Sequence, residues 1–331
     1  MKALVTGATG FLGSNLVHEL HAQGWEVRAS GMYGSETRYL DALPVEVELA
    51  DITQPADCAR IVAGCDVVFH VAGDTSFWRR HYARQRRINV AGTAHIAQAC
   101  IDAGVRRLVH TSTADLLGYH PDASPVDERG GSAHFEGLGY NYGETKRAAE
   151  EHLRGLDPEA LEVVYVYPGF MIGPFDHTLQ IGRVFFDLAR GAVPAAPPGA
   201  SSFCHVREVA RAHVAAATRG RAGEGYLCAG MPHSNLSYAE LFRRMAQAIQ
   251  ARPPRLTAPR SLFVAYGQLC ELLAAVTGRP PEMNPGQARY MSLPQAADSS
   301  KAIRELGYTV PPVEQCIADA LTWYRAQGYE I

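Results

Sequence analysis

A glycine-rich turn near the N-terminus constrains the fold of this chain more than any other feature. Glycines at positions 7, 10 and 13 follow the apolar run Lys2–Thr6 and open a helical pattern at about 12–23. The first glycine permits a sharp turn, the second lets the backbone approach a pyrophosphate, and the third lets helix and strand pack closely. The N-terminus of the helix offers free N–H groups to an anion. The alternative is a tight turn without a ligand. The residues predicted to bind a dinucleotide here are Gly7, Thr9, Gly10, Phe11, Leu12 and Gly13.

Valine-rich runs alternate with helical patterns through the rest of the first half. The runs show little polar alternation, as expected for parallel strands covered on both faces. Repeated strand–helix–strand units predict an α/β fold with a Rossmann-type doubly wound parallel sheet. The predicted strands are 2–6, 26–30, 45–49, 67–71, 108–111 and 163–167, and the predicted helices are 12–23, 55–63, 89–103 and 142–155.

The pattern changes after about residue 175, where prolines interrupt the chain and helical segments dominate. A length of 331 residues suggests a cofactor domain with a smaller lobe. We therefore expect a dinucleotide-binding domain at 1–175 and a mostly helical substrate-binding lobe at 176–331, parts of which return to the Rossmann sheet. Ser237 and Glu240 form a capping box in the sequence. The helices predicted for this half are 207–218, 238–250, 261–276, 301–306 and 313–327.

Charge and cysteine usage exclude several classes of protein. The net charge is −3 and no basic face is implied, so nucleic acid and anionic membranes are not expected partners. Five arginines between 79 and 87 are interpreted as a solvated helix face, with an anion site as the alternative. Seven scattered cysteines without a CxxC pair indicate reduced thiols and no zinc site. No metal site is expected.

No targeting signal or membrane span is predicted. The first apolar residues run straight into the glycine turn, so no signal peptide is expected. No apolar run approaches the length that spans a bilayer. The most apolar stretch, 261–276, contains Gln268 and Glu271 and is expected to be a packed helix. A cytoplasmic location is the expectation.

The end of the second predicted strand bears on the choice of cofactor. An NAD site normally has an acidic residue here for the ribose 2′-hydroxyl, and none occurs between Val27 and Ser35. A carboxylate would repel a 2′-phosphate, so its absence favours NADP(H) over NAD(H), with Arg28 or Arg38 as the counter-charge. Asp51 and Ile52 suit the adenine edge, although Asp51 could equally cap a helix before Pro55.

The ordered set of motifs resembles the extended short-chain dehydrogenase/reductase family over essentially the full length. Within it the chain is similar to the dihydroflavonol-4-reductase-like branch and to the proteins called hopanoid-associated sugar epimerases. The chain departs from the family pattern at three positions. Thr113 stands where the family has a serine. Met32 stands where plant-type reductases have an arginine, and Tyr167 stands where nucleotide-sugar enzymes have an arginine. The motifs that carry the resemblance are 6–13, 51–52, 70–73, 89–93, 111–113, 142–146, 168–169, 173–174 and 277–281, with the endings 306–308 and 323–326.

Tyr142 and Lys146 are four residues apart and project from one face of a predicted helix. A free phenol has a pKa of about 10, and a neighbouring ammonium favours the phenolate. The pair therefore predicts proton transfer to or from a substrate oxygen. An isolated pair of this kind usually belongs to an ordinary amphipathic helix, but its position downstream of Thr111-Ser112-Thr113 favours catalysis. Tyr140 is expected to face elsewhere, and Asn89 to tie two backbone segments together.

The resemblance implies further roles for individual residues. Thr113 would hydrogen-bond the substrate oxygen, and Lys146 would hold the nicotinamide ribose. The histidines at 70, 110 and 205 are expected to be satisfied packing residues. Family members often form homodimers through the helices at 89–103 and 142–155. The remaining cofactor-binding residues are Val71, Ala72, Gly73, Tyr142, Pro168 and Met171, and the substrate-binding residues are Phe77, Trp78 and Phe170.

Three functions are compatible with these features. The first is reduction of a fairly apolar ketone or aldehyde, or oxidation of the alcohol, by hydride transfer with Tyr142 as acid or base. The second is an epimerase or dehydratase of nucleotide sugars that retains NAD, which the lack of an arginine at Tyr167 disfavours. The third is a non-enzymatic cofactor-sensing protein. Such proteins tend to lose the tyrosine or the lysine, and both are present here. In each case the partner is a small molecule.

Overall fold

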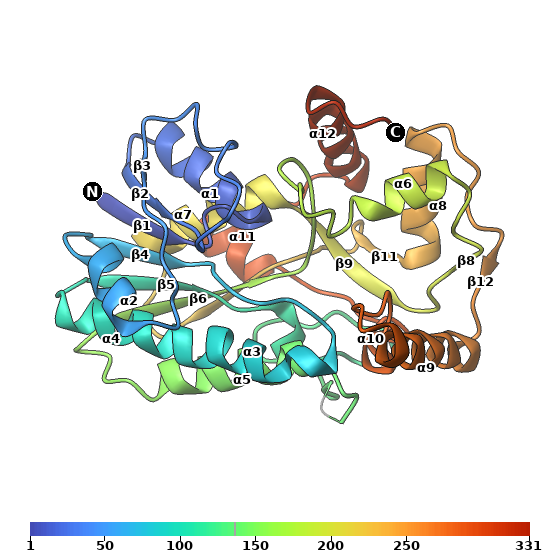
Figure 1. The fold of residues 1–331 in the computed structure, drawn as a ribbon, viewed down its shortest axis with the longest axis horizontal. Coiled ribbons are helices and arrows are strands. Elements are labelled where there is room, and N and C mark those ends of the chain that lie inside the picture. The colour runs from blue at the N-terminus through green and yellow to red at the C-terminus, as the bar shows by residue number, and fades with distance from the viewer. Residues whose placement is uncertain (136) are drawn as a thin grey trace.

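A seven-stranded, all-parallel sheet forms the centre of the protein in the computed structural model, which describes residues 1–135 and 137–331. Within those residues the strand order is β10-β6-β5-β4-β1-β2-β3 (Figure 1). The chain runs outward from β1 to β3 and then returns to place β4 on the other side of β1. The predicted Rossmann-type sheet is therefore confirmed. The strands are β1 (Lys2–Thr6), β2 (Glu26–Ser30), β3 (Glu46–Val47), β4 (Val67–His70), β5 (Arg107–Thr111), β6 (Glu162–Pro168) and β10 (Gly225–Cys228).

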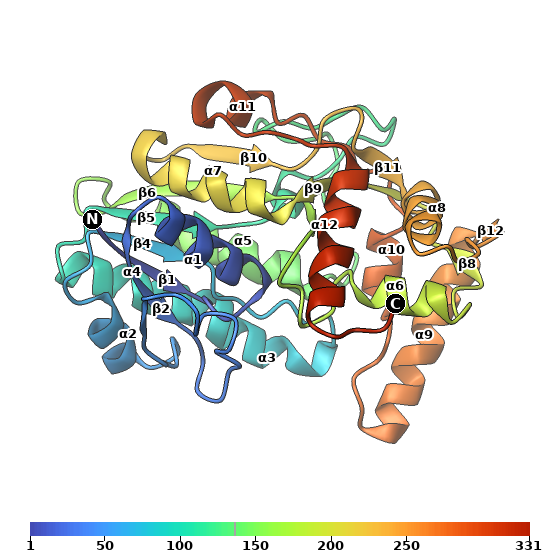
Figure 2. The same ribbon diagram turned by 90° about the horizontal axis from the view of Figure 1, so that it is seen from above.

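Helices cover both faces of the sheet (Figures 1 and 2). On one face, buried residues of β4 and β5 pack with those of α2 and α4. On the other face, α1 packs against α7 and α11 packs against α7 and β10. The helix predicted at 89–103 begins earlier, as a π-helix over Arg86–Gly92 that continues into α4. The helices of these two layers are α1 (Phe11–Ala22), α2 (Pro55–Val62), α4 (Thr93–Asp102), α5 (Asn141–Arg154), α7 (Val206–Arg219) and α11 (Ser300–Leu306).

The seventh strand, β10, was not predicted. Its four residues are all buried and pair in parallel with β6, but a run of four is too short to carry a strand pattern of its own. Gly225 is required there because a side chain would overlap the ring of Tyr167. The second half of the chain thus contributes α7, β10 and α11 to the layers of the sheet.

The remaining elements form a lobe beside the sheet. Ser237 accepts a hydrogen bond of 3.1 Å from the Glu240 N–H, as the capping box predicts, but the Glu240 carboxylate binds Arg243 and Arg244 instead of closing the box. The short strands of this lobe were not predicted. Its elements are β7 (Phe170–Ile172), β8 (Ala195–Ala196), β9 (Ala200–His205), β11 (Asn235–Ser237), β12 (Leu256–Thr257), α6 (Arg183–Ala189), α8 (Tyr238–Ala248), α9 (Arg260–Thr277), α10 (Pro285–Tyr290) and α12 (Val313–Ala326).

The helix expected at 261–276 is present as α9, but it is packed on one side only, against α10. α9 buries only Gly267 and Ala274 and projects from the body of the lobe (Figure 2). These two small residues let α9 approach α10 closely, since a Cβ at Gly267 would lie 2.8 Å from the Asn284 carbonyl oxygen. The large apolar side chains consequently point outward. Among the described residues, no helix combines the length and apolar character needed to cross a bilayer.

The arginines between 79 and 87 lie on a 3-10 helix (Arg79–His81), on α3 (Tyr82–Gln85) and at the start of the π-helix. All five are exposed, and Arg84 pairs with Asp74 at 2.7 Å. The five arginines are therefore solvated, and Arg84 also lines the cavity described below. The seven cysteines are unpaired.

Candidate active site

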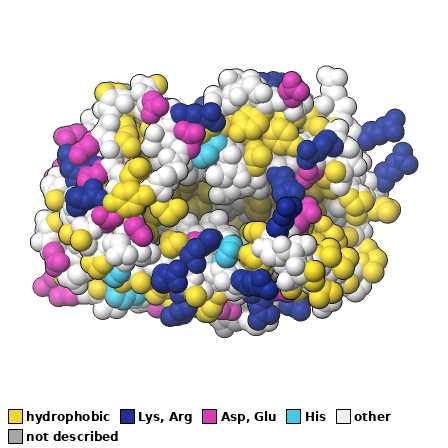
Figure 3. All heavy atoms as spheres, viewed as in Figure 1, with side chains coloured by type: hydrophobic (Ala, Val, Ile, Leu, Met, Phe, Trp, Pro, Cys, Tyr) yellow, Lys and Arg dark blue, Asp and Glu magenta, His cyan; other side chains and the backbone are white. Residues whose placement is uncertain are grey.

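A cavity of about 1560 Å³ lies at the carboxyl ends of the central strands, between the sheet and the lobe. It is the hollow at the centre of Figure 3. One wall comes from the glycine turn and the ends of β2, β4 and β5, and the other from β7, α8, α9 and α10. This is the edge where ligands bind in open α/β sheets.

The glycine turn has the shape that a pyrophosphate requires. Gly7 has a φ of +67°, and a Cβ there would lie 2.8 Å from the Ala72 backbone. A Cβ at Gly13 would overlap the Gly7 carbonyl. No side chain caps the N-terminus of α1, so its first N–H groups are available to an anion. Six predicted cofactor residues, Gly7, Thr9, Gly10, Phe11, Leu12 and Gly13, line the cavity here.

The end of β2 provides a polar but uncharged wall. Gly31, Met32 and Ser35 line the cavity there, as do Asp51 and Ile52 after β3. The Asp51 carboxylate also accepts a hydrogen bond of 2.9 Å from the Thr53 N–H. Asp51 therefore both lines the cavity and stabilises the turn before α2.

Arg28 and Arg38 do not reach the cavity. Arg28 donates hydrogen bonds of 2.8 Å to the carbonyls of Ile61 and Ala63 and pairs with Glu46 at 3.0 Å. Its position in β2 directs it toward the C-terminus of α2. Arg38 stacks on Tyr39, 4.7 Å from the ring centroid. Among the described residues, no lysine or arginine lines the cavity at the end of β2.

The three proposed catalytic residues come from the end of β5 and the first turns of α5. Thr113 and Tyr142 line the cavity, whereas Lys146 lies behind them and is buried. The Lys146 ammonium donates a hydrogen bond of 2.6 Å to the Thr111 carbonyl. Burial lowers the pKa of Lys146 to about 8, and the nearby Glu150 carboxylate opposes that shift.

The phenol of Tyr142 is held in its neutral form. Burial raises its pKa above the ordinary value, the Asp115 carboxylate raises it further, and the Thr113 hydroxyl lowers it. Lys146 is not among the groups that shift the pKa of Tyr142, contrary to the expected effect of a neighbouring ammonium. The charge of Lys146 acts instead on His70 and His110, whose pKa values it lowers.

Asn89 holds this region together as predicted. Its carbonyl oxygen accepts a 2.7 Å hydrogen bond from the Asp74 N–H, and its amide donates 3.0 Å to the Asp74 carbonyl and 2.9 Å to the Thr145 hydroxyl. Thr145 lies on α5 between Tyr142 and Lys146. The side chain thereby joins the segment after β4 to the helix that carries both residues.

Asp115 is a cavity residue that the sequence reasoning missed. Its carboxylate accepts hydrogen bonds from Tyr140 at 2.8 Å and Tyr290 at 2.6 Å, and burial raises its pKa. Tyr140 thus faces Asp115, in keeping with the expectation that it points away from Lys146. The one available signal was the position of Asp115 two residues after Thr113, since Tyr290 is far away in the sequence.

The three histidines that were predicted to be satisfied packing residues differ in their hydrogen bonds. His70 lies between the hydroxyls of Thr6 (2.8 Å) and Thr93 (2.9 Å), and His205 contacts Asp319 at 3.1 Å, so both are satisfied as predicted. For His110 the prediction is wrong, because neither ring nitrogen has a hydrogen-bond partner among the described residues. Burial and then the charge of Lys146 hold the pKa of His110 well below its usual value.

Two of the three predicted substrate residues line the cavity, and the third does not. Phe77 and Phe170 line the cavity; Phe77 stacks on Tyr140 with centroids 5.7 Å apart. Trp78 lies outside the lining, edge-on to His81 at 4.9 Å. Tyr167 also points away and donates to Glu150 at 2.7 Å. The predicted cofactor residues Val71, Ala72, Gly73, Pro168 and Met171 all line the cavity.

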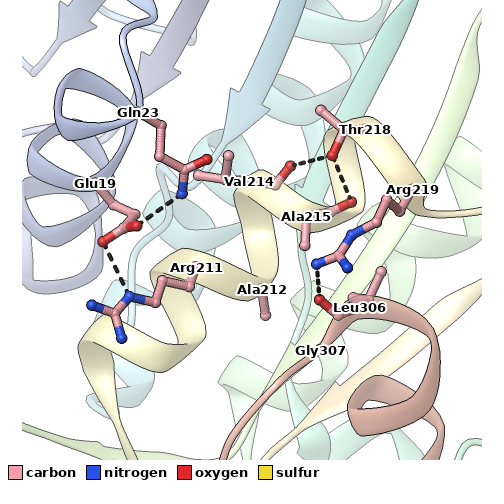
Figure 4. Close-up of a pocket in the computed structure, with 10 residues that line it drawn as sticks. All are labelled: Glu19, Gln23, Arg211, Ala212, Val214, Ala215, Thr218, Arg219, Leu306 and Gly307. Atoms are coloured by element: carbon pink, nitrogen blue, oxygen red, sulfur yellow. Dashed lines mark hydrogen bonds and ion pairs between the residues drawn. The ribbon is translucent and has the colours of Figure 1, made fainter.

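A second hollow, of about 370 Å³, lies between α1, α7 and α11 (Figure 4). Glu19 contacts both Arg211 and Gln23 there, and Arg219 binds the Leu306 carbonyl. These polar groups are already paired with one another, so we place no ligand in this hollow.

Comparison with known proteins shows which family the sequence matches. The sequence profile described as "NAD dependent epimerase/dehydratase family" matches residues 3–229. The chain is 32% identical to "Sterol demethylase protein B" of Methylococcus capsulatus over 99% of both chains. It is 30% identical to "Putative dihydroflavonol 4-reductase" of Synechocystis, over 98% of this chain and 95% of that one. It is also 30% identical to "2-alkyl-3-oxoalkanoate reductase" of Stenotrophomonas maltophilia, over 95% and 96%.

Solved structures agree with the fold over its whole length. The crystal structure of a protein named gox2253 superposes with a TM-score of 0.84, at 29% identity and 99% coverage of both chains. A nucleoside-diphosphate-sugar epimerase from Pseudomonas aeruginosa superposes with a TM-score of 0.79, at 25% identity, over 100% of this chain and 99% of that one.

Proposed function

Because the chain belongs to the NAD dependent epimerase/dehydratase family, an extended short-chain dehydrogenase/reductase group, we propose that it reduces a ketone or aldehyde of a fairly apolar small molecule, or oxidises the corresponding alcohol. The observation that carries this proposal is the position of two hydroxyls, Thr113 and Tyr142, in the wall of an aromatic cavity that the glycine turn also lines. A carbonyl oxygen between these hydroxyls would receive a hydrogen bond from Thr113 and a proton from Tyr142.

The residues around the cavity fit a nicotinamide dinucleotide. The uncapped N-terminus of α1 and the turn at Gly7 would hold the pyrophosphate. Asp51 and Ile52 would hold the adenine end, and the residues after β4 and β6 (Val71, Ala72, Gly73, Pro168 and Met171) would hold the nicotinamide end. When bound, the nicotinamide supplies or accepts the hydride. Lys146 would bind the nicotinamide ribose through ammonium protons that its bond to Thr111 leaves available.

The protonation states of this chain suit reduction. The raised pKa of Tyr142 keeps the phenol protonated near neutrality, so it can donate a proton to the developing alkoxide. The pKa of Lys146, about 8, leaves that group mostly charged at the same pH. Aromatic residues of the lobe, Phe170 and Tyr290 among them, line this part of the cavity and would limit the access of water to a bound substrate.

We propose NADP(H) in preference to NAD(H) as the cofactor. The support is the absence of a carboxylate between Val27 and Ser35, together with the hydroxyls of Ser30 and Ser35 at that wall. Arg28 and Arg38 no longer contribute to this argument, because both are bound elsewhere.

A nucleotide-sugar epimerase or dehydratase is the second candidate, favoured by the similarity to the Pseudomonas protein. Two measurements on the purified protein distinguish the two candidate functions. The first measurement compares the thermal shift produced by NADPH and NADH, and the second follows nicotinamide absorbance with a panel of ketones and aldehydes of increasing apolar length. We expect NADPH oxidation with apolar ketones. Tightly bound NAD in the purified protein, with no ketone reduced, would instead establish the second candidate.

A further inference from the structure

The outer face of α9 is apolar and uncovered. Leu262, Tyr266, Leu269, Leu273 and Val276 follow one another at alternating spacings of four and three residues, so they share one side of the helix. Their exposed fractions range from 43% for Tyr266 to 81% for Val276. We call this set, together with the 63%-exposed Leu272, the α9 face. Contiguous exposed apolar side chains of this kind mark an interaction site.

Arginines flank both ends of the helix. Arg252, Arg255 and Arg260 precede it or begin it, Arg279 follows it, and all four are exposed. Their side chains form no ion pair or hydrogen bond with any residue in the described part of the chain. Figure 3 shows hydrophobic side chains gathered at the lower right, over the region of α9, and basic side chains that protrude from the upper right edge of the lobe.

Acidic groups do little to offset these arginines. Glu282 is the nearest that contacts the α9 face: it accepts a hydrogen bond of 3.2 Å from Tyr266 and lies 3.6 Å from Arg183. Glu271, the acidic residue within α9, is half-buried and lies off the face. α9 and the segments that adjoin it in the sequence thus carry four exposed arginines, although the whole chain has a net charge of −3. The net charge of the whole chain predicted that an anionic membrane is not a partner. The exposed arginines near α9 instead favour an anionic surface at this place.

The α9 face is continuous with the mouth of the cavity. Leu262, Phe263 and Tyr266 line the cavity from the first two turns of α9. Leu262 and Tyr266 thus belong both to the α9 face and to the lining of the cavity that holds Tyr142.

We propose that the α9 face is a docking surface for an anionic phospholipid bilayer. The helix would lie in the plane of the interface, with its leucines at the boundary of headgroups and acyl chains and with Arg252, Arg255 and Arg279, which lie in the segments before and after the helix, among anionic headgroups. Resting on the proposed function, we also infer that an apolar substrate enters the cavity directly from the bilayer, past Leu262 and Tyr266.

A second copy of the chain fits the face less well. The four-three spacing would allow two α9 helices to pair along a seam. However, arginines lie at both ends of the helix, so parallel and antiparallel pairing alike would bring arginine against arginine with no acidic partner. A bilayer rich in anionic lipid has the complementary charge.

Cosedimentation of the full chain with lipid vesicles tests the docking surface. The vesicles are phosphatidylcholine alone, or phosphatidylcholine with phosphatidylglycerol at roughly three to one. We expect strong binding to the anionic vesicles only. Leu269→Gln, Leu272→Gln and Leu273→Gln combined, none of which lines the cavity, should weaken binding by roughly tenfold or more. Arg252→Gln with Arg255→Gln should weaken it by roughly fivefold to thirtyfold.

Matched controls use exposed residues on other faces. Val47→Gln with Ile303→Gln removes exposed apolar side chains, and Arg304→Gln with Arg325→Gln removes the same charge as the α9 arginine pair. Both should bind as the wild type does, and unchanged circular dichroism and melting temperature verify folding. Equal loss in the controls, or no vesicle binding by the wild type, overturns the proposal. So does a dimer in light scattering that the triple leucine variant dissociates without any vesicle binding.

The entry route has a separate readout. With vesicles present, the triple leucine variant should reduce a long-chain, vesicle-embedded ketone more slowly than the wild type, while its rate on a short water-soluble ketone is unchanged. Equal slowing of both ketones overturns the route. If vesicles bind but no ketone is reduced, the proposed function fails and the docking surface stands.

Discussion

The ammonium of Lys146 lies 2.6 Å from the carbonyl oxygen of Thr111, the last residue of β5. This bond connects the helix that carries Tyr142 to the strand that leads to Thr113, and a second buried bond of 2.6 Å, from the Ser112 hydroxyl to Glu150, joins the same two elements. It also means that, without cofactor, the ammonium stabilises a backbone carbonyl and not a phenolate. The properties expected of the site follow from this arrangement.

Tyr142→Phe should abolish carbonyl reduction while leaving cofactor binding intact. The substitution removes the proton donor and keeps the ring that lines the cavity. We expect kcat to fall by about 10²–10⁴-fold, the range of positioned proton transfer, with an unchanged thermal shift on adding NADPH. Tyr140→Phe serves as the control, because Tyr140 donates to Asp115. Retention of full ketone reduction by Tyr142→Phe would contradict the role of Tyr142 as the proton donor.

Lys146 should give the protein a stability that increases with pH in the alkaline range. Burial lowers the folded-state pKa from 10.5 to about 8, so between these values the unfolded chain binds the extra proton. Stability then rises as the pH increases through this window. The free energies of unfolding of the wild type and of Lys146→Met can be measured with denaturant at pH values from 7 to 10. Over this range the wild type should gain about 2 kcal/mol of stability relative to the variant. A pH-independent difference would refute the shift.

Alanine substitutions at two positions of the glycine turn should have different effects, one on stability and the other on cofactor binding. A Cβ at Gly13 would overlap the Gly7 carbonyl, whereas at Gly10 the nearest atom is 3.3 Å away. We expect Gly13→Ala to lower the free energy of unfolding by at least about 2 kcal/mol. Gly10→Ala should fold normally but bind NADPH more weakly, because its methyl group projects where the pyrophosphate backbone contact is made. Urea unfolding and a thermal-shift titration measure the two effects.

Replacing His110 with leucine should not destabilise the protein at neutral pH. Its ring nitrogens have no hydrogen-bond partner among the described residues. Removing an unsatisfied buried polar group raises the free energy of unfolding by about 1 kcal/mol. The folded-state pKa lies well below 6.5, so stability of the wild type is lost as pH falls below 6.5. His110→Leu should therefore lose less stability than the wild type between pH 7 and 5. His205→Leu, which breaks the contact to Asp319, should be destabilising instead.

Local patterns in the sequence were sufficient for the Rossmann sheet, the glycine turn and the pairing of Tyr142 with Lys146 on one helix. Each depends on backbone sterics or on spacing within a few residues, and such effects do not require knowledge of distant neighbours. The boundaries of β1 and β2 agreed to the residue for the same reason.

Tertiary structure alone decided where the charged and exposed groups point. The direction of Arg28 depends on the register of β2 with β3 and on the end of α2, and the partners of Asp115 include Tyr290, 175 residues away. β10 is a strand only because β6 is beside it, and α9 is uncovered only because Gly267 and Ala274 occupy its one packed side. Hydrophobic periodicity tells which side chains are apolar, but whether an apolar face is buried depends on which other segment the completed fold brings against it.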